Sequence, residues 1–186
     1  GCPVVGVGAD LMSHIVDVRA EVLRTPLHTP FVTALRRTEH LETVLVRITD
    51  DAGRVGWGDA PQVWQVTGDS LRSGLTCLEE MIAPAITGLV NPSVDERRLS
   101  RVTERGVGPA HFGDKADRLA PDVAQSVVAR NYGIKAAVDE ALWDVAAQEA
   151  ELSLAAALAV SAGRSANVPL AIPTDVTVSA GEPDEL

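Results

Sequence analysis

The 186 residues of the chain are enough for one domain with a sizeable core, and too few for a complete (β/α)8 barrel, which takes roughly 250 residues. Hydrophobic residues make up 46% of the chain and charged residues 23%, which is typical of a folded globular protein and not of a disordered one. The net charge of -10 argues against a nucleic-acid partner, because binding a phosphate backbone requires clustered Lys and Arg.

Two further features concern the compartment in which the protein works. No apolar run approaches the ~20 residues that span a bilayer, so no membrane partner is expected. Cys2 and Cys77 form neither a CxxC pair nor a disulfide framework, which indicates a reduced, cytoplasmic protein.

The first third of the chain predicts an antiparallel sheet. Residues 15–23 alternate between polar and apolar side chains, and the apolar face contains Val16, Val18, Ala20 and Val22. Residues 43–49 alternate in the same way, with Val44, Val46 and Ile48 on one side. DDAGR then supplies a turn before VGWGDA, so these three runs predict a three-stranded antiparallel meander. Between the first two runs, Pro26 and Pro30 cannot donate to a ladder, and we expect an exposed loop there.

Helical periodicity replaces alternation after Pro61. Apolar side chains recur at helical spacing from Leu71 to Ile82, and Pro84 is expected to end this helix. SVDE at 93–96 has the pattern of a capping box that opens another helix. Residues 106–121 contain Gly and Pro without periodicity and predict a loop.

A helix is predicted over residues 122–150, and it carries two apolar faces. One face contains Ile134, Val138, Ala141, Leu142 and Val145. The nearly opposite face contains Tyr132, Ala136, Trp143 and Ala147. Such a helix is expected to be sandwiched between the meander and a second layer.

Three blocks of sequence carry a resemblance to a known family. The stretch from Thr25 to Asp69 contains PFVTALR at 30–36 and GWGDAP at 56–61; a second block reads KAAVDEALWDVAAQ at 135–148, and a third reads PTDVTVSAGEPDEL at 173–186. The same blocks occur in the same order in bacterial dipeptide epimerases such as the L-Ala-D/L-Glu epimerases. Those enzymes belong to the muconate-lactonizing-enzyme subgroup of the enolase superfamily, which this chain therefore resembles over most of its length.

The resemblance implies an α+β fold. The expected architecture is an enolase-like N-terminal capping domain, with the three-stranded meander followed by a helical bundle, and then the first strand of a truncated (β/α)7β barrel. On this basis residues 1–12 are expected to be an extension and residues 13–150 the capping domain. Residues 151–186 would be a linker, for which SAGRSANVP at 161–169 has the right composition, and the truncated start of the catalytic barrel.

The resemblance also implies a substrate-binding site. In the family, the arginine of the pattern PF-x-TALR lies in a loop that closes over the substrate and binds the side-chain carboxylate of the dipeptide's glutamate. Arg36 and Phe31 match this pattern, and a guanidinium suits a planar carboxylate because it donates two charge-assisted hydrogen bonds. A solvated arginine in an exposed loop is the alternative. Thr177 matches a barrel-strand threonine near the substrate, and His28 lies where the family varies, so it is expected to tune specificity.

The GWGDAP motif matches the family's GWGEAP. The resemblance implies that its glycines let the backbone approach the mouth of the barrel. Asp59 stands where glutamate is usual, and we expect it to have a structural role at the end of a strand.

Enzymes of the family abstract a proton α to a carboxylate or carboxamide carbonyl, and lysines of the barrel act as acid and base. A Mg2+ ion, bound by three carboxylates, stabilises the enediolate intermediate. All of these residues would follow position 186, so the chain is expected to contain no catalytic and no metal-binding residue. Its four histidines show neither HxH nor HExxH spacing, and Asp139, Glu140 and Asp144 are expected to form a solvated helical stripe with a Lys135–Asp139 pair.

The expected function is thus the capping, specificity-determining part of a Mg-dependent dipeptide epimerase, inactive by itself. The expected partners are a small-molecule dipeptide and the missing barrel domain, and self-association into a homo-oligomer stays open. Another enzyme of the superfamily is an alternative: an N-acylamino acid racemase, an o-succinylbenzoate synthase or a muconate cycloisomerase. So is a non-catalytic truncated remnant.

Overall fold

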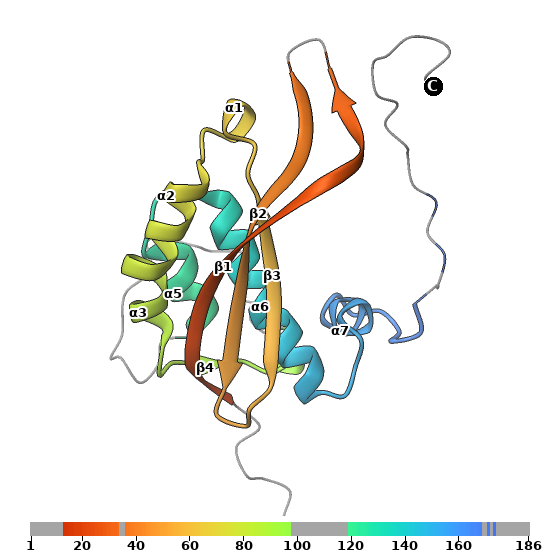
Figure 1. Cartoon of the computed structure of the whole chain (residues 1–186). Coiled ribbons are helices and arrows are strands. Elements are labelled where there is room, and N and C mark those ends of the chain that lie inside the picture. Colours follow the sequence, from red (N-terminus) through yellow and green to blue (C-terminus); the bar gives the residue numbers. More distant parts are fainter. Residues whose placement is uncertain (1–12, 34–35, 98–118, 169–170, 172, 174–186) are drawn as a thin grey trace, which may run out of the picture.

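The computed structural model describes residues 13–33, 36–97, 119–168, 171 and 173 (Figure 1). Their main feature is a sheet with the strand order β3-β2-β1-β4, in which every neighbouring pair is antiparallel. The strands are β1 (Ser13–Val32), β2 (Arg37–Asp50), β3 (Val55–Pro61) and the short β4 (Val90–Asn91). The predicted meander is confirmed, and β4 is added at its edge.

Burial along β2 follows the predicted alternation, whereas β1 departs from it. Val44, Val46 and Ile48 are fully buried, as their spacing predicts. In β1 the register shifts between Ile15 and Asp17, so one additional residue is accommodated opposite β2. Ile15 therefore enters the core while Val16 is 51% exposed, and the prediction that Val16 is buried was wrong.

One long helical run follows the sheet. After α1 (Trp64–Thr67), the run comprises α2 (Leu71–Thr76), a π-helical segment η1 (Cys77–Ile82) and α3 (Ala83–Ile86). Ser70 caps α2 through reciprocal hydrogen bonds with Ser73. Pro84 does not end the helix as predicted, because the wider π turn makes it a first-turn residue of α3, where its missing N–H costs little.

The C-terminal helices differ from the single helix predicted over 122–150. The chain forms α5 (Ala120–Ser126) and α6 (Tyr132–Glu149), separated at Asn131, whose φ of 62° is left-handed and cannot continue a helix. A further helix, α7 (Leu154–Ser161), lies in the stretch assigned to the linker, and it ends where SAGRSANVP begins. In the described part of the chain, no helix is both long and apolar enough to cross a membrane.

Helix α6 lies along one face of the sheet, behind β2 and β3 in Figure 1, and its core-facing side chains are buried as predicted. The opposite face is covered only in its C-terminal half. There Trp143 is 5% exposed, because the Arg97 guanidinium stacks 4.4 Å from its ring centroid, and Ala147 packs with Val94 and Ala157. Tyr132, near the start of the helix, is 71% exposed. The second layer thus comes from this chain itself.

The glycines of GWGDAP lie against α6. A Cβ added at Gly56 or Gly58 would collide with the backbone of Ala141 or Ala137, respectively, so only glycine allows β3 and α6 to approach this closely. Within the described residues these glycines thus serve the contact between β3 and α6, and their approach to a barrel mouth stays a prediction.

Close approach lets α6 bind the free edge of β3. Asp144 accepts a hydrogen bond from the Trp57 N–H at 3.1 Å, and Glu140 accepts one from the Asp59 N–H, also at 3.1 Å. The two acceptors are four residues apart on the helix, and the two donors are two residues apart on the strand. Four residues of helix and two residues of strand both span about 6 Å, so the acceptors and donors align. Within the expected solvated stripe, Glu140 and Asp144 thus contact the sheet edge, whereas the Asp139 side chain is 44% exposed and its Oδ1 lies 3.8 Å from Arg97 Nη1. The expected Lys135–Asp139 pair is absent from the described contacts, because Lys135 Nζ donates to the Gln125 carbonyl at 2.9 Å.

Candidate substrate-specificity site on the β1–β2 hairpin

Strands β1 and β2 extend beyond the rest of the sheet as a two-stranded arm, which projects from the body of the molecule in Figure 1. Pairing between β2 and β3 ends at Thr43 and Pro61, whereas β1 and β2 stay paired up to Val32 and Arg37. The exposed loop predicted around Pro26 is therefore a hairpin. Pro26 is tolerated there because β1 is an edge strand at this level, so its missing N–H disrupts no ladder on the outer side.

A bulge interrupts the arm on the β1 side. Pro26 pairs with His40 and the next rung joins Phe31 to Thr38, so residues 27–30 lie opposite Glu39 alone. His28 lies in this bulge and is exposed, and its Nδ1 lies 3.2 Å from Thr29 Oγ1. The bulge thus presents additional side chains on one side of the arm, next to the turn.

The turn holds Arg36 through Thr33. The N–H of Thr33 donates to the carbonyl of Arg36 at 2.8 Å, and the N–H of Arg36 donates to Thr33 Oγ1 at 3.2 Å. These bonds close the turn in both directions and fix the backbone from which the Arg36 side chain extends. Phe31 and Arg36 are both half-buried, and Phe31 lies two residues before Thr33 in the hairpin.

The three arginines of the arm differ in their partners. Arg24 pairs with Glu42 at 3.2 Å and Arg37 pairs with Glu39 at 3.0 Å. Within the described residues, the guanidinium of Arg36 makes no ion pair and no hydrogen bond. Among the three arginines of the arm, Arg36 is thus the one whose charge is available for a carboxylate from outside the described residues. A guanidinium can bind such a carboxylate through two parallel hydrogen bonds.

The other residues singled out in the sequence have different positions. Asp59 lies at the root of the arm, where its carboxylate accepts a hydrogen bond from Thr43 Oγ1 at 3.4 Å and its N–H binds Glu140. This agrees with the structural role expected of it. Thr177 and the strand predicted at 174–178 lie outside the described residues, as do residues 106–118 of the predicted loop. Thr33 was missed as a positioning residue, although a threonine three residues before Arg36 is a signal for a side-chain-closed turn.

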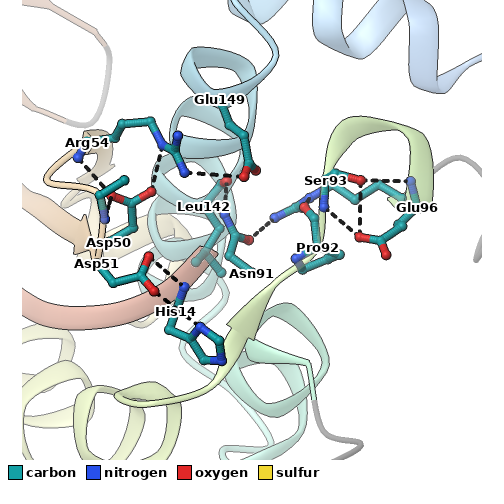
Figure 2. Close-up of polar contacts among 12 residues, drawn as sticks. His14, Asp50, Asp51, Arg54, Asn91, Pro92, Ser93, Glu96, Leu142 and Glu149 are labelled. Carbon is teal, nitrogen blue, oxygen red and sulfur yellow. Dashed lines mark hydrogen bonds and ion pairs between the residues drawn. The ribbon is translucent and has the colours of Figure 1, made fainter. Parts of the chain in front are cut away.

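A second polar cluster lies at the opposite end of the sheet (Figure 2). Arg54 joins the buried Asp50, at 2.7 Å from Nε to Oδ2, to Glu149 of α6, at 3.2 Å from Nη2 to Oε1. Burial raises the pKa of Glu149, Arg54 opposes that shift, and the nearby carboxylates reinforce it. The cluster ties the β2–β3 turn to the end of α6.

Beside it, the predicted capping box is confirmed and a buried polar chain continues the cluster. The Ser93 N–H and hydroxyl both donate to Glu96 Oε2, at 2.9 Å and 3.1 Å. Asn91 receives a bond of 2.6 Å from Arg97 and donates to the Leu142 carbonyl at 3.0 Å. In the described part of the chain no group of three or more His, Cys, Asp or Glu residues could hold a metal ion.

Comparison with known proteins gives one consistent result. The family described as "Mandelate racemase / muconate lactonizing enzyme, N-terminal domain" matches residues 15–159. The L-Ala-D/L-Glu epimerase of Bacillus subtilis (strain 168) is 33% identical over 172 residues, which are 92% of this chain and 39% of that protein. The chain thus spans less than half the length of this relative.

Two solved structures resemble the chain in three dimensions. The substrate-liganded L-Ala-D/L-Glu epimerase from Bacillus subtilis matches with a TM-score of 0.58 and 32% identity, over 76% of this chain and 33% of that chain. The dipeptide epimerase from Cytophaga hutchinsonii, in complex with Mg and the dipeptide D-Ala-L-Val, matches with a TM-score of 0.68 over 92% of this chain and 39% of that one. Its identity of 23% makes it a similarity of fold.

Proposed function

Because the chain belongs to the mandelate racemase and muconate lactonizing enzyme N-terminal domain family of the enolase superfamily, we propose that it is the capping, substrate-selecting part of a Mg-dependent dipeptide epimerase. The α+β architecture predicted for it, that of an enolase-like N-terminal domain, is confirmed by the fold. The catalytic domain of this enzyme would lie outside residues 1–186, and the proposed activity is that of the whole protein.

The observation that carries the proposal is the guanidinium of Arg36, which has no partner within the described residues, on a projecting hairpin whose other two arginines are paired. The L-Ala-D/L-Glu epimerase of Bacillus subtilis, which matches over 92% of the chain, is named for a dipeptide whose second residue is Glu. A glutamate side chain offers the planar carboxylate that such a guanidinium binds best. Arg36 therefore holds the acidic side chain of the second residue, and Thr33 positions Arg36 by closing the turn.

Phe31 and His28 would complete the site from the same arm. Phe31, half-buried in the second rung from the turn, would contact the aliphatic part of the substrate and limit its exposure to water. Exclusion of water strengthens the charge pair with Arg36, since the Coulomb energy rises as the local dielectric falls. His28, in the bulge, would select among substrates and take no part in proton transfer. Thr177 is proposed to approach the substrate from the catalytic domain.

Mg2+ is the metal that the proposal implies, as in the dipeptide epimerase from Cytophaga hutchinsonii. It would stabilise the negative charge that develops on the substrate carbonyl when the α proton is removed. The described residues offer no cluster that could hold it. The contribution of this chain is to bind the dipeptide side chain and to exclude water.

The test compares two adjacent arginines in the complete enzyme. Arg36→Ala removes a charge-assisted contact whose loss should cost about 2–4 kcal/mol in kcat/KM for Ala-Glu, or about 30- to 900-fold. Arg37→Ala is the matched control, because Arg37 is already paired with Glu39 and should change kcat/KM less than about threefold. The loss from Arg36→Ala should be much smaller for a dipeptide with a neutral second residue.

Three outcomes would contradict the proposal. Equal losses for acidic and neutral dipeptides would mean that Arg36 only maintains the hairpin. Absence of any dipeptide epimerisation in the complete protein, with turnover of N-acylamino acids or a muconate instead, would assign it to another activity of the superfamily. Activity that survives EDTA treatment would exclude the proposed metal.

A further inference from the structure

The two edges of the sheet differ in how their backbone is covered. On the β3 edge, two carboxylates of α6 accept hydrogen bonds from the N–H groups of Trp57 and Asp59. On the β1 edge, β4 pairs only with Ser13 and His14, and Ile15 bonds to the segment just before β4. Beyond Ile15, the described residues provide no partner strand for this side of β1. A sheet edge of this kind can pair with a strand of another molecule.

The rungs of the sheet show which backbone groups of β1 face this open edge. The Trp57 N–H points to α6, so Trp57 and Arg47 form a rung in which β2 and β3 exchange no hydrogen bond. Arg47 therefore bonds to its other partner, Arg19 of β1. Bonded and free residues alternate along an antiparallel strand, so the even-numbered residues from 18 to 24 direct their N–H and C=O groups to the open edge. In the described part of the chain these groups make no hydrogen bond.

The open stretch can pair with the same stretch of a second copy, in antiparallel orientation about a two-fold axis. It lies between Ile15, which is already bonded, and Pro26, which has no N–H to donate. The residue on the axis fixes the register. With Glu21 on the axis, the two copies of Glu21 would face each other, and like charges directly opposite are destabilising. With Val22 on the axis, Pro26 would lie opposite Val18 and leave that rung without its donor.

Ala20 on the axis gives a register that is complementary in charge and in shape. Arg19 of each copy then lies opposite Glu21 of the other, on the face of the sheet that points away from α6. The Arg19 side chain is 67% exposed, and the exposed Glu21 makes no ion pair among the described residues. On the opposite face, Val22, which is 48% exposed, would pack against Val18 of the other copy. The small side chain of Ala20 lets the two strands approach at the axis.

We propose that two copies of the chain associate through their β1 edges, with Ala20 on the two-fold axis, and form one continuous antiparallel sheet. A peptide from another protein could bind the same backbone groups, but an interface between identical copies needs a surface that is its own complement. Arg19 and Glu21 provide that complement, because the axis exchanges their positions. The two hairpin arms point away from the axis in opposite directions, so Arg36 stays accessible in both copies.

The test exchanges the charges of the two residues. Sedimentation equilibrium of the 186-residue chain should show a monomer and a dimer in equilibrium. Arg19→Glu or Glu21→Arg alone places like charges opposite each other in both charged rungs and should raise the dissociation constant of the dimer by about tenfold or more. An equimolar mixture of the two variants should regain the dimer, because each charged rung then joins a glutamate to an arginine. Glu39→Arg, an equal change of charge at an exposed position of β2, is the matched control and should leave the dissociation constant unchanged.

Hydrogen exchange of the amides identifies the edge that pairs. In the monomer the N–H groups of Arg19 and Glu21 bond to β2 and should exchange slowly, whereas those of Ala20 and Val22 should exchange fast. A higher protein concentration should slow the exchange of Ala20 and Val22 in the native chain, and should not do so in either single variant.

Four results would overturn the proposal. One is a chain that stays monomeric up to its limit of solubility. Another is a dimer that both single variants retain, which would place the interface elsewhere on the surface. A mixture of the variants that fails to associate would mean that the two charges are not paired across the axis. Slow exchange of Ala20 in a monomer would mean that another segment of the same chain covers the edge.

Discussion

Replacement of Gly58 by alanine should separate β3 from α6. The added Cβ would lie 2.8 Å from the carbonyl carbon of Ala137 and closer still to its oxygen, which is inside the 3.0 Å that real Cβ atoms respect. The obstacle is helix backbone, so no rotation of a side chain can relieve it. Helix α6 or strand β3 must move by about 1 Å, a gap that forfeits a quarter to a half of the dispersion energy between the atoms involved.

The magnitude follows from what this movement disrupts. Overpacking of a well-packed core costs about 1–3 kcal/mol. The displacement also lengthens the hydrogen bonds that Asp144 and Glu140 accept from the edge of β3, which are 3.1 Å long. Bonds to charged groups contribute about 1.5–3 kcal/mol each, and less where water can replace the acceptor. We expect Gly58→Ala to lower the free energy of unfolding by about 3–4 kcal/mol, a large share of the ~5–15 kcal/mol that domains possess.

The measurement is urea denaturation of the chain followed by circular dichroism, with Gly74→Ala as the matched control. Gly74 is buried in α2, but a Cβ there meets nothing closer than 3.8 Å. Alanine should therefore be accepted and should raise stability by about 0.5–1 kcal/mol through helix propensity. The two substitutions should thus have opposite signs. A cost below about 1 kcal/mol for Gly58→Ala, or equal effects at both sites, would refute the claim that close contact between α6 and β3 requires glycine.

Three further predictions concern the carboxylates. The His14 backbone N–H, more than the His14 ring, holds the pKa of Asp51 below its usual value, so the stabilisation that Asp51 provides is present above the unfolded pKa and is lost as the pH falls through the folded pKa. In a pH series of melting temperatures, Asp51→Asn should therefore reduce the decrease in melting temperature at acidic pH. His14→Ala should reduce it less, because this variant keeps the backbone N–H. Asp144→Ala removes the acceptor of the Trp57 N–H and should cost about 1–2 kcal/mol in urea denaturation. Burial raises the pKa of Glu149, so the folded state loses stability as the pH rises from the unfolded pKa of this carboxyl group through its folded pKa. The difference in free energy of unfolding between the native chain and Glu149→Gln should therefore change in favour of Glu149→Gln over that pH interval.

The local patterns of the sequence determined much of the fold. The alternation of Val44, Val46 and Ile48 is sufficient to orient β2, because successive side chains of a strand point to opposite faces. The Ser93 and Glu96 capping box likewise forms as its spacing predicts, since all of its partners lie within one turn. The resemblance located Arg36 and Phe31 on the segment that forms the projecting hairpin.

Only the tertiary structure decided the features that join distant parts of the chain. The bulge that exposes Val16, the approach of α6 to Gly58, and the burial of Trp143 under Arg97 each depend on which elements meet, and no local spacing encodes that. The same holds for Glu149, which reads as a polar residue at the exposed end of a helix until Arg54, 95 positions away in sequence, is brought to it. A local sequence pattern indicates which side chains of a segment are buried. The free energy of close packing and of a buried charge depends instead on the residues that contact the segment, and folding alone brings those residues together.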